Sequence, residues 1–191
     1  DAVFTPSRNL ADIARKVWWT PREKIAYFPN GINCDAFLDA PDLDAIPGFQ
    51  RVEGEVVVGT VAAIRKVKNL SRLVRVFAQA AKGRAARLVI VGAGDDLENV
   101  QAEAVRCGVA DQVCFPGFLS DPAKFMGLFD LFALSSDSEQ MPLSVVEAMA
   151  AGLAVVATDV GDVKEMVGEP NQPFVAAASD EVLFAKNLET L

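Results

Sequence analysis

The chain has 191 residues, of which 51% are hydrophobic and 23% charged, and its formal net charge is −8. This composition supplies a sizeable core for one large domain, or one domain plus a fragment, and excludes a disordered chain. An acidic chain repels a phosphate backbone, so nucleic acid is not an expected partner. The absence of histidine excludes Ser-His-Asp chemistry, a histidine general base and most zinc sites.

No apolar run approaches the roughly 20 residues that span a bilayer, and no signal peptide is visible. The three cysteines, Cys34, Cys107 and Cys114, are odd in number and lack the spacing of metal ligands. Free thiols indicate a reducing, cytoplasmic compartment. The chain opens without an initiator Met and stops inside a helix-like segment at Leu191, so we expect a piece of a longer protein.

The first 54 residues predict a small α/β segment followed by a loop. Residues 2–5 and 24–28 are short apolar strands, and Ser7 is expected to cap a helix that continues to Val17. Trp18 and Trp19 are expected in a core by default, and packing at an interdomain hinge is the alternative. Residues 41–54 contain prolines and glycines among charges and predict a linker-like loop.

From residue 55 onward, apolar strands alternate with amphipathic helices. We expect strands at 56–62, 87–91, 113–115, 130–134, 154–157 and 174–175. We expect helices at 70–81, 96–106, 121–127, 142–151 and 162–167, and a last helix capped by Ser179. This alternation is typical of an α/β fold, a Rossmann-like parallel sheet with helices on both faces. Ligands bind such sheets beyond the carboxyl ends of the strands.

Two glutamates flank a predicted helix start. Glu139 lies in the polar loop after the strand at 130–134, and Glu147 falls about one and a half turns into the helix that starts at Pro142. The free N–H groups of that helix end favour an anion. Carboxylates that bind hydroxyls beside amides that bind phosphate predict a pocket for a nucleotide-activated sugar. In a chain with 26 acidic residues, the pair also fits two solvated surface carboxylates.

The loop after the strand at 56–62 carries three cations. Arg65, Lys66 and Lys68 lie where a bound diphosphate can be neutralised. A solvated basic turn explains the same residues equally well.

Two further patterns resemble ligand motifs only weakly. Gly92-Ala93-Gly94 follows a strand, but Leu97 stands where a dinucleotide fingerprint has its third glycine. An NAD(P)-dependent oxidoreductase is therefore an alternative, and a tight bend between strand and helix is the other reading. Asp42-Leu43-Asp44 has the form of a metal–nucleotide motif. It lies in the linker-like stretch and not at a strand exit, so we predict no metal site.

The segment from Ser135 to the strand at 154–157 carries the most specific signature. Ser-x-x-x-Glu, then Met-Pro-Leu-Ser-Val-Val-Glu-Ala-Met-Ala-Ala-Gly, then an apolar strand closely resembles the motif of retaining glycosyltransferases of the GT-B fold, family 4. The resemblance covers nearly the whole chain. It implies three parts: residues 1–40 as the end of the N-terminal half and the crossover, 41–54 as a linker-like loop, and 55–191 as a donor nucleotide-sugar-binding domain truncated at its C-terminal end.

The resemblance also implies roles for single residues. Glu147 would bind the ribose hydroxyls, and Glu139 the hydroxyls of the transferred sugar. Lys68 matches the lysine that contacts the donor diphosphate, whereas Ala63 stands at the family's arginine position and Arg65 is the nearest guanidinium. The implied catalytic residues are therefore Glu139, Lys68 and Arg65. The other implied donor contacts are backbone groups: N–H groups facing the diphosphate and sugar at Met141, Pro142, Leu143 and Ser144, and a base-binding turn at Gly117, Phe118 and Leu119.

The implied reaction moves a sugar from a nucleoside diphosphate to an acceptor glycan or lipid with retention of configuration, without a cofactor or a required metal. The implied partners are the donor and a missing N-terminal half, which would supply the acceptor site and any peripheral membrane association. We therefore expect this piece to be inactive alone. Because of Ala63, a non-catalytic GT-B-like binding domain is a second alternative. Gly161 and Asp162 match the family's Gly-Gly-x-x-Glu only in part, and we expect them to be structural.

Overall fold

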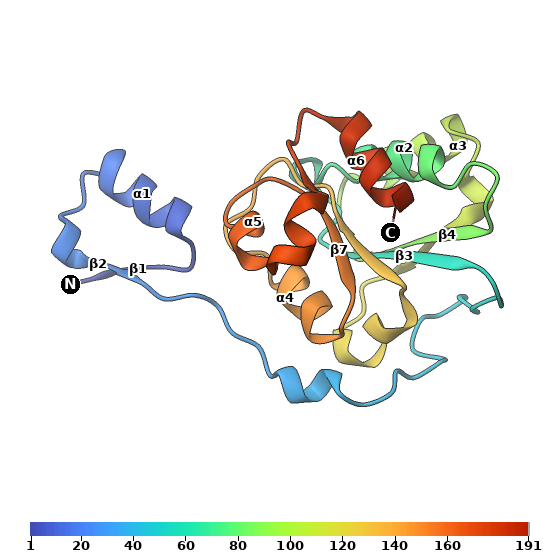
Figure 1. Ribbon diagram of the computed structural model, residues 1–191, viewed down its shortest axis with the longest axis horizontal. Helices are drawn as coiled ribbons and strands as arrows, with labels where there is room; N and C mark the ends of the chain where they lie inside the picture. Colours follow the sequence, from blue (N-terminus) through green and yellow to red (C-terminus); the bar gives the residue numbers. More distant parts are fainter. Residues whose placement is uncertain (191) are drawn as a thin grey trace.

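The computed structural model describes residues 1–190, which form a six-stranded parallel sheet flanked by helices and a separate two-stranded sheet near the N-terminus (Figure 1). The α/β fold class predicted from the sequence is confirmed. The strands are β1 (Val3–Thr5), β2 (Ile25–Tyr27), β3 (Val56–Val61), β4 (Ala86–Val91), β5 (Val113–Gly117), β6 (Leu131–Leu134), β7 (Ala154–Thr158) and β8 (Val175–Ala176). The α-helices are α1 (Arg8–Lys16), α2 (Leu70–Ala80), α3 (Leu97–Arg106), α4 (Leu143–Ala150), α5 (Val163–Met166) and α6 (Glu181–Thr190).

The large sheet has the strand order β5-β4-β3-β6-β7-β8, and every neighbouring pair is parallel. Within this sheet, the first strand in the sequence, β3, lies in the middle. The strands β4 and β5 follow on one side of it, and β6, β7 and β8 follow on the other side. β3 and β6 are in register at Val58 with Leu131 and at Gly59 with Phe132. The order therefore reverses between β3 and β6, which is the point where open α/β sheets bind their ligands.

Two hydrophobic cores lie on opposite faces of this sheet. Helices α2, α3 and α6 cover one face and bury Leu73, Phe77 and Phe184 against it (Figure 1). Helices α4 and α5 cover the other face together with the segment between β5 and β6. The linker-like loop also contributes to this second core, through Ile46 and Phe49.

Helices α1 and α2 start at residues whose side chains cap them, whereas no side chain within residues 1–190 caps α3, α4 or α5. Ser7 accepts a hydrogen bond from the Leu10 N–H at 3.0 Å, and Asn69 caps α2 through the Arg72 N–H at 3.2 Å. The prediction for α6 is wrong by one residue. Its cap is Asp180, whose carboxylate accepts the Leu183 N–H at 2.9 Å.

The helix expected over residues 121–127 is absent. Two short 3-10 turns, Pro122–Lys124 and Met126–Leu128, take its place. The segment contains a glycine, which disfavours a helix. That glycine, Gly127, lies so close to Pro41 that an added Cβ would be 3.0 Å from the proline ring, so contact with the linker-like loop sets the local path.

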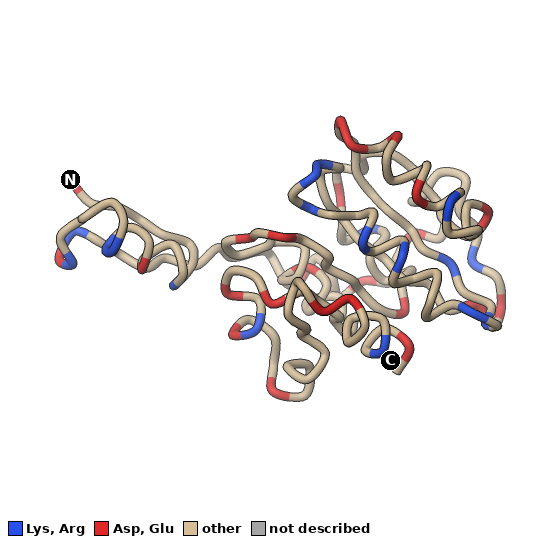
Figure 2. The backbone as a smooth tube through the Cα atoms, turned by 90° about the horizontal axis from the view of Figure 1, so that it is seen from above, with Lys and Arg blue, Asp and Glu red and all other residues tan. Residues whose placement is uncertain are grey.

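The N-terminal segment, β1-α1-β2, projects from the rest of the chain in both views (Figures 1 and 2). It touches the large domain where α1 begins. The N–H groups of Arg8 and Asn9 donate to the two carboxylate oxygens of Asp162 at 2.6 and 3.1 Å. Trp18 and Trp19 are exposed here, so the expectation that they lie in a core is wrong.

Candidate functional site

The loops that follow β3 and β6 meet at the carboxyl edge of the sheet. Lys68 ends a 3-10 turn, Lys66–Lys68, between β3 and α2, and Glu139 lies in the loop between β6 and α4. Although 71 positions apart in sequence, their side chains form an ion pair, with 2.6 Å between Lys68 Nζ and Glu139 Oε1. The structure therefore brings two of the three predicted catalytic residues together at the switch point of the sheet.

The ion pair is shielded but reachable. The Lys68 side chain is 24% exposed and that of Glu139 is 10% exposed. Glu139 Oε1 also accepts a hydrogen bond from Ser136 Oγ at 2.7 Å. Among residues 1–190, nothing donates to Oε2, the other oxygen of this carboxylate. Glu139 can thus accept a hydroxyl while Lys68 keeps further ammonium protons for an anion.

Helix α4 starts beside this pair with an open N-terminus. Pro142 occupies the N-cap position, one residue before the first helical position expected for it, and no side chain caps the helix. The first turn contains no acidic residue. Since proline has no N–H, the expected backbone donor at Pro142 is wrong, and Met141, Leu143 and Ser144 supply the available amides. The positive end of the helix dipole is therefore left for an anion.

Glu147 lies about one turn inside α4 and is half-buried. Burial raises the pKa of its carboxyl group above the ordinary glutamate range. No ion-pair or hydrogen-bond partner for this carboxylate occurs within the described chain. A half-buried carboxylate without a partner is an acceptor that a ligand hydroxyl can satisfy.

An apolar cavity of about 230 Å³ opens along the same edge of the sheet. It is lined by the ends of β3 and β4 and by the loop after β5, at Val61, Ala62, Ala63, Val91, Gly92, Ala93, Phe118 and Leu119. The Phe118 ring is largely exposed, and the Gly117 carbonyl accepts the Gly92 N–H at 2.8 Å. Two residues of the predicted base-binding turn, Phe118 and Leu119, thus line an apolar cavity at this edge.

Arg65, the third predicted catalytic residue, is not gathered into this cluster. Its side chain is exposed, and it forms no hydrogen bond or ion pair within residues 1–190. Ala63, at the position where the family pattern has an arginine, lines the apolar cavity. The described geometry therefore provides one positioned cation, Lys68, and two exposed cations without a side-chain partner just before it, Arg65 and Lys66.

The glycines of Gly92-Ala93-Gly94 have a packing role. A Cβ on Gly92 would lie 1.8 Å from the Ala62 carbonyl oxygen, and one on Gly94 would lie 2.1 Å from that of Ile64. Both positions must be glycine for the loop after β4 to pass the loop after β3. This contact explains the motif without a dinucleotide.

Asp42 and Asp44 form a local turn. Asp42 Oδ1 accepts the Asp44 N–H at 3.0 Å, which is the geometry of an Asx turn. Across residues 1–190, no cluster of three or more acidic or cysteine side chains is arranged to hold a metal ion.

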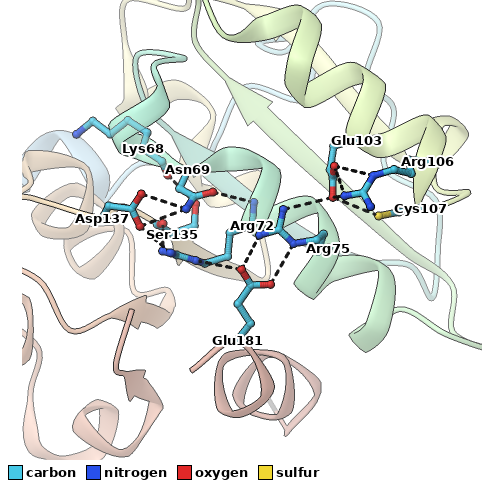
Figure 3. A network of polar contacts seen from close by, with 10 residues as sticks. All are labelled: Lys68, Asn69, Arg72, Arg75, Glu103, Arg106, Cys107, Ser135, Asp137 and Glu181. Carbon is cyan, nitrogen blue, oxygen red and sulfur yellow. Dashed lines mark hydrogen bonds and ion pairs between the residues drawn. The ribbon is translucent and has the colours of Figure 1, made fainter. Parts of the chain in front are cut away.

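Sequence reasoning missed the residues that join the two loops. Arg72, Asp137 and Ser135 connect the turn at Lys68 to the loop at Glu139 (Figure 3). The available signal was an arginine next to apolar core positions in the predicted helix at 70–81, since a buried arginine requires partners.

Another cavity, of about 340 Å³, lies at the opposite edge of the sheet. It is lined by the first residues of β3 and β4, Val56 and Ala86, and by the end of α6. It is remote from the strand-exit loops and belongs to no part of the site. In the described part of the chain, no helix combines the length and the apolar character needed to cross a membrane.

The strand order and the residues at its switch point define a Rossmann-like α/β domain. The chain belongs to the family described as Glycosyl transferases group 1, whose model matches residues 44–191.

Curated relatives extend well beyond the matched region. An uncharacterized glycosyltransferase of Methanocaldococcus jannaschii, MJ1607, is 28% identical over 171 residues, which cover 86% of this chain and 44% of that protein. The 2-deoxystreptamine glucosyltransferase of Streptomyces kanamyceticus is 31% identical over 141 residues, 72% of this chain and 36% of the relative. The chain thus spans less than half the length of these relatives.

The fold matches solved glycosyltransferase-like structures. That of Alr3699/HepE from Anabaena in complex with UDP has a TM-score of 0.87 and 23% identity, and the match covers 99% of this chain and 53% of that one. The same protein with UDP and glucose gives a TM-score of 0.85. The structural neighbours of this chain are of the GT-B type, which agrees with the fold predicted from the motif.

Proposed function

We propose that this chain is the donor-binding, C-terminal part of a family 4 GT-B glycosyltransferase. It would move a hexose from a nucleoside diphosphate to an acceptor glycan or lipid with retention of configuration. The observation that carries the proposal is the Lys68–Glu139 ion pair beside the uncapped start of α4, at the switch point of the sheet. Complexes of the Anabaena relative with UDP and with UDP-glucose support a nucleotide-sugar donor.

Each part of the edge has a counterpart in such a donor. The apolar cavity takes the base, with backbone groups of Phe118 and Leu119 reading its edge. Glu147 accepts the ribose hydroxyls, and Glu139 Oε2 accepts a hydroxyl of the sugar. The amides at the start of α4 and the Lys68 ammonium bind the diphosphate. These groups interact most strongly with the negative charge that develops as the diphosphate leaves, so they lower the barrier to transfer.

The charge at the site supports a role for Arg65. Lys68 already offsets Glu139, whereas a departing nucleoside diphosphate carries more than one negative charge. Arg65 and Lys66 lie on the same loop, and both are exposed without a side-chain partner among residues 1–190. Of the two, only Arg65 has a guanidinium, which can bind a diphosphate through two nitrogens. We propose that it turns toward the diphosphate when donor binds, and that this second cation makes a bound metal unnecessary.

The acceptor site and the second wall of the cleft would come from an N-terminal half. We therefore propose that the 191-residue chain binds nucleotide weakly and does not turn over alone. The whole enzyme would work in the cytoplasm, and any association with a membrane surface would occur through that other half.

Calorimetric titration of the chain with UDP, GDP and ADP tests donor binding. We expect one of them to bind, and Glu147→Ala to weaken it by about 1–3 kcal/mol because charged hydrogen bonds to the ribose are lost. Glu165→Ala is the matched control, since Glu165 is an exposed carboxylate on the neighbouring helix α5. Equal affinities in wild type and Glu147→Ala would remove Glu147 from the site. Binding of NADH and of none of the three nucleotides would instead favour an oxidoreductase function.

A second candidate is a non-catalytic nucleotide-binding domain of the same fold, which the alanine at position 63 favours. It predicts that the full-length protein binds nucleotide sugar but transfers none. Ala63→Arg in the full-length protein separates the two functions. Transfer gained only in that variant would favour the non-catalytic reading, and transfer by the wild type would exclude it.

A further inference from the structure

A buried arginine on helix α2 reaches the loop that carries Glu139. Arg72 is 8% exposed, and its two terminal nitrogens bind different groups of that loop. Nη1 donates to the Ser135 carbonyl oxygen at 2.9 Å, and Nη2 donates to Asp137 Oδ1 at 2.6 Å (Figure 3). Ser135 and Asp137 lie four and two residues before Glu139, so this guanidinium binds the loop just before the site.

The turn that carries Lys68 also contacts this loop. Asn69 Nδ2 donates to both carboxylate oxygens of Asp137 at 3.1 and 3.2 Å, and the Asp137 N–H donates to the Val67 carbonyl at 2.8 Å. Ser135 Oγ donates to the Lys68 carbonyl at 2.9 Å. Figure 3 shows Asn69, Arg72, Ser135 and Asp137 converging beside Lys68. The loops after β3 and β6 are thus joined by several polar contacts with Asp137 at the centre.

The chemistry of the guanidinium explains why arginine is needed here. A planar fork with donors pointing in fixed directions can bind a carbonyl and a carboxylate at once, whereas a lysine ammonium is a single point charge. Because Arg72 is removed from water, its charge must be balanced by neighbours. Asp137 and Glu181 provide this balance, with Glu181 Oε1 at 3.5 Å from Arg72 Nε.

We propose that Arg72 is a positioning residue for the nucleotide-sugar site. By fixing Ser135 and Asp137 against the Lys68 turn, it sets the separation of Lys68 Nζ and Glu139 Oε1. Donor diphosphate then meets a preformed pair of groups and does not have to order two loops on binding. This inference rests on the proposed donor-binding function and extends it to a residue outside the pocket.

The next turn of α2 supplies a matched control. Arg75 lies three residues after Arg72 and is paired with Glu181 and Glu103. It makes no polar contact with residues 135–139 in the described chain (Figure 3). Arg72→Lys and Arg75→Lys therefore make the same chemical change in the same ion-pair network, but only the first affects the loop of Glu139.

The first measurement needs no ligand. Hydrogen exchange of the 191-residue chain should show about tenfold faster exchange in residues 66–69 and 135–139 for Arg72→Lys, because their mutual contacts open locally. Arg75→Lys should leave both segments unchanged. If Arg72→Lys does not fold, Asp137→Ala replaces it, since the Asp137 side chain is half-exposed and its loss spares the core. Unchanged exchange at both segments would overturn the inference.

The second measurement separates positioning from general stability. Uridine lacks the diphosphate, so we compare UDP with uridine in titrations of each variant. Arg72→Lys should lower the ratio of UDP to uridine affinity by about five- to tenfold, as expected for coupled contacting groups, while Arg75→Lys keeps it. An unchanged ratio would overturn the positioning role even if exchange is faster. If wild type binds UDP no better than uridine, the proposed donor function fails, whereas the exchange result still decides whether Arg72 joins the loops.

Discussion

Residues 55–190 bury a hydrophobic core on each face of a six-stranded sheet, whereas residues 1–28 bury one hydrophobic side chain, that of Ala14. The N-terminal segment instead exposes most of its large apolar side chains: Phe4, Val17, Trp18, Trp19, Tyr27 and Phe28. Two parallel strands and one helix provide too little buried area for independent stability. The stability of the N-terminal segment in this chain therefore depends on its contacts with the large domain.

The contact between the two regions lies next to the candidate site. Asp162, which is 5% exposed, accepts the first two amides of α1, and Ser7 Oγ donates to Gln140 Oε1 at 2.9 Å. The turn before Asp162 packs tightly on the site loop, because a Cβ on Gly161 would lie 2.7 Å from the Glu139 carbonyl oxygen. The position of α1 and the path of the Glu139 loop are thus linked through one turn.

The largest contrast is expected from one substitution made in both regions. Phe77→Ala removes a fully buried ring from the core under α2 and should destabilise the chain by about 3–5 kcal/mol. Phe28→Ala removes a ring that is 72% exposed and should change stability by no more than about 0.5 kcal/mol. Urea unfolding followed by circular dichroism measures both. Equal losses of stability in the two variants would mean that Phe28 contributes to a core as much as Phe77 does.

The second contrast breaks the contact between the regions. Asp162→Ala leaves two α1 amides without their acceptor and should weaken docking of the segment by about 1–3 kcal/mol. Hydrogen exchange at residues 8–16 should accelerate, while β3 and β6 stay protected. Asp159→Ala is the control, because Asp159 is an exposed carboxylate three residues earlier in the same loop. Protection of α1 that survives in Asp162→Ala would show that other contacts hold it.

The third prediction concerns pH and lies within the large domain. Burial raises the pKa of Glu147, so the folded chain binds this proton more readily than the unfolded chain. The ionised form therefore costs stability, and this cost grows as pH rises from the ordinary glutamate range through the raised folded value.

Glu147→Gln removes that cost. The free energy of unfolding of this variant relative to wild type should rise as pH increases from about 4 to 7. The nucleotide affinity of the variant should be lower than that of wild type. Glu165→Gln, which removes an exposed carboxylate from the neighbouring helix α5, is measured as the control. A Glu147→Gln variant that loses stability relative to wild type as pH increases would contradict the assigned effect of burial.

The smallest effect is expected at a helix cap. Asp180→Ala should destabilise α6 by about 1 kcal/mol, because the Leu183 N–H loses its acceptor. Ser179→Ala should be neutral. Thermal unfolding of the two variants distinguishes them, and a loss confined to Ser179→Ala would restore the cap predicted from the sequence.

The sequence predicted the parallel sheet well because its signals are local. Continuous apolar strands such as β3 and β4 and capping residues such as Ser7 and Asn69 act within a few positions. The helix predicted over residues 121–127 was wrong because the path of this segment depends on the contact between Gly127 and Pro41, which the periodicity of the sequence does not reveal. The prediction that Trp18 and Trp19 lie in a core was wrong for a similar reason. It assumed that large apolar side chains are buried, although the N-terminal segment buries few other side chains against which they could pack.

At the site, the motif placed Lys68 and Glu139 on loops that the strand order brings together. Their 2.6 Å contact and its support by Arg72 could not be predicted, since they depend on side chains from distant parts of the chain. The backbone role expected at Pro142 failed on covalent grounds alone.

The measurement that tests donor binding most directly is an NMR titration of the chain with UDP, with backbone amides assigned. We expect the largest shifts at Leu143 and Ser144, at Lys68 and around residues 117–119, where the diphosphate and the base are proposed to bind. Shifts confined to the other cavity, around Val56 and Ala86, with none at the start of α4, would contradict it.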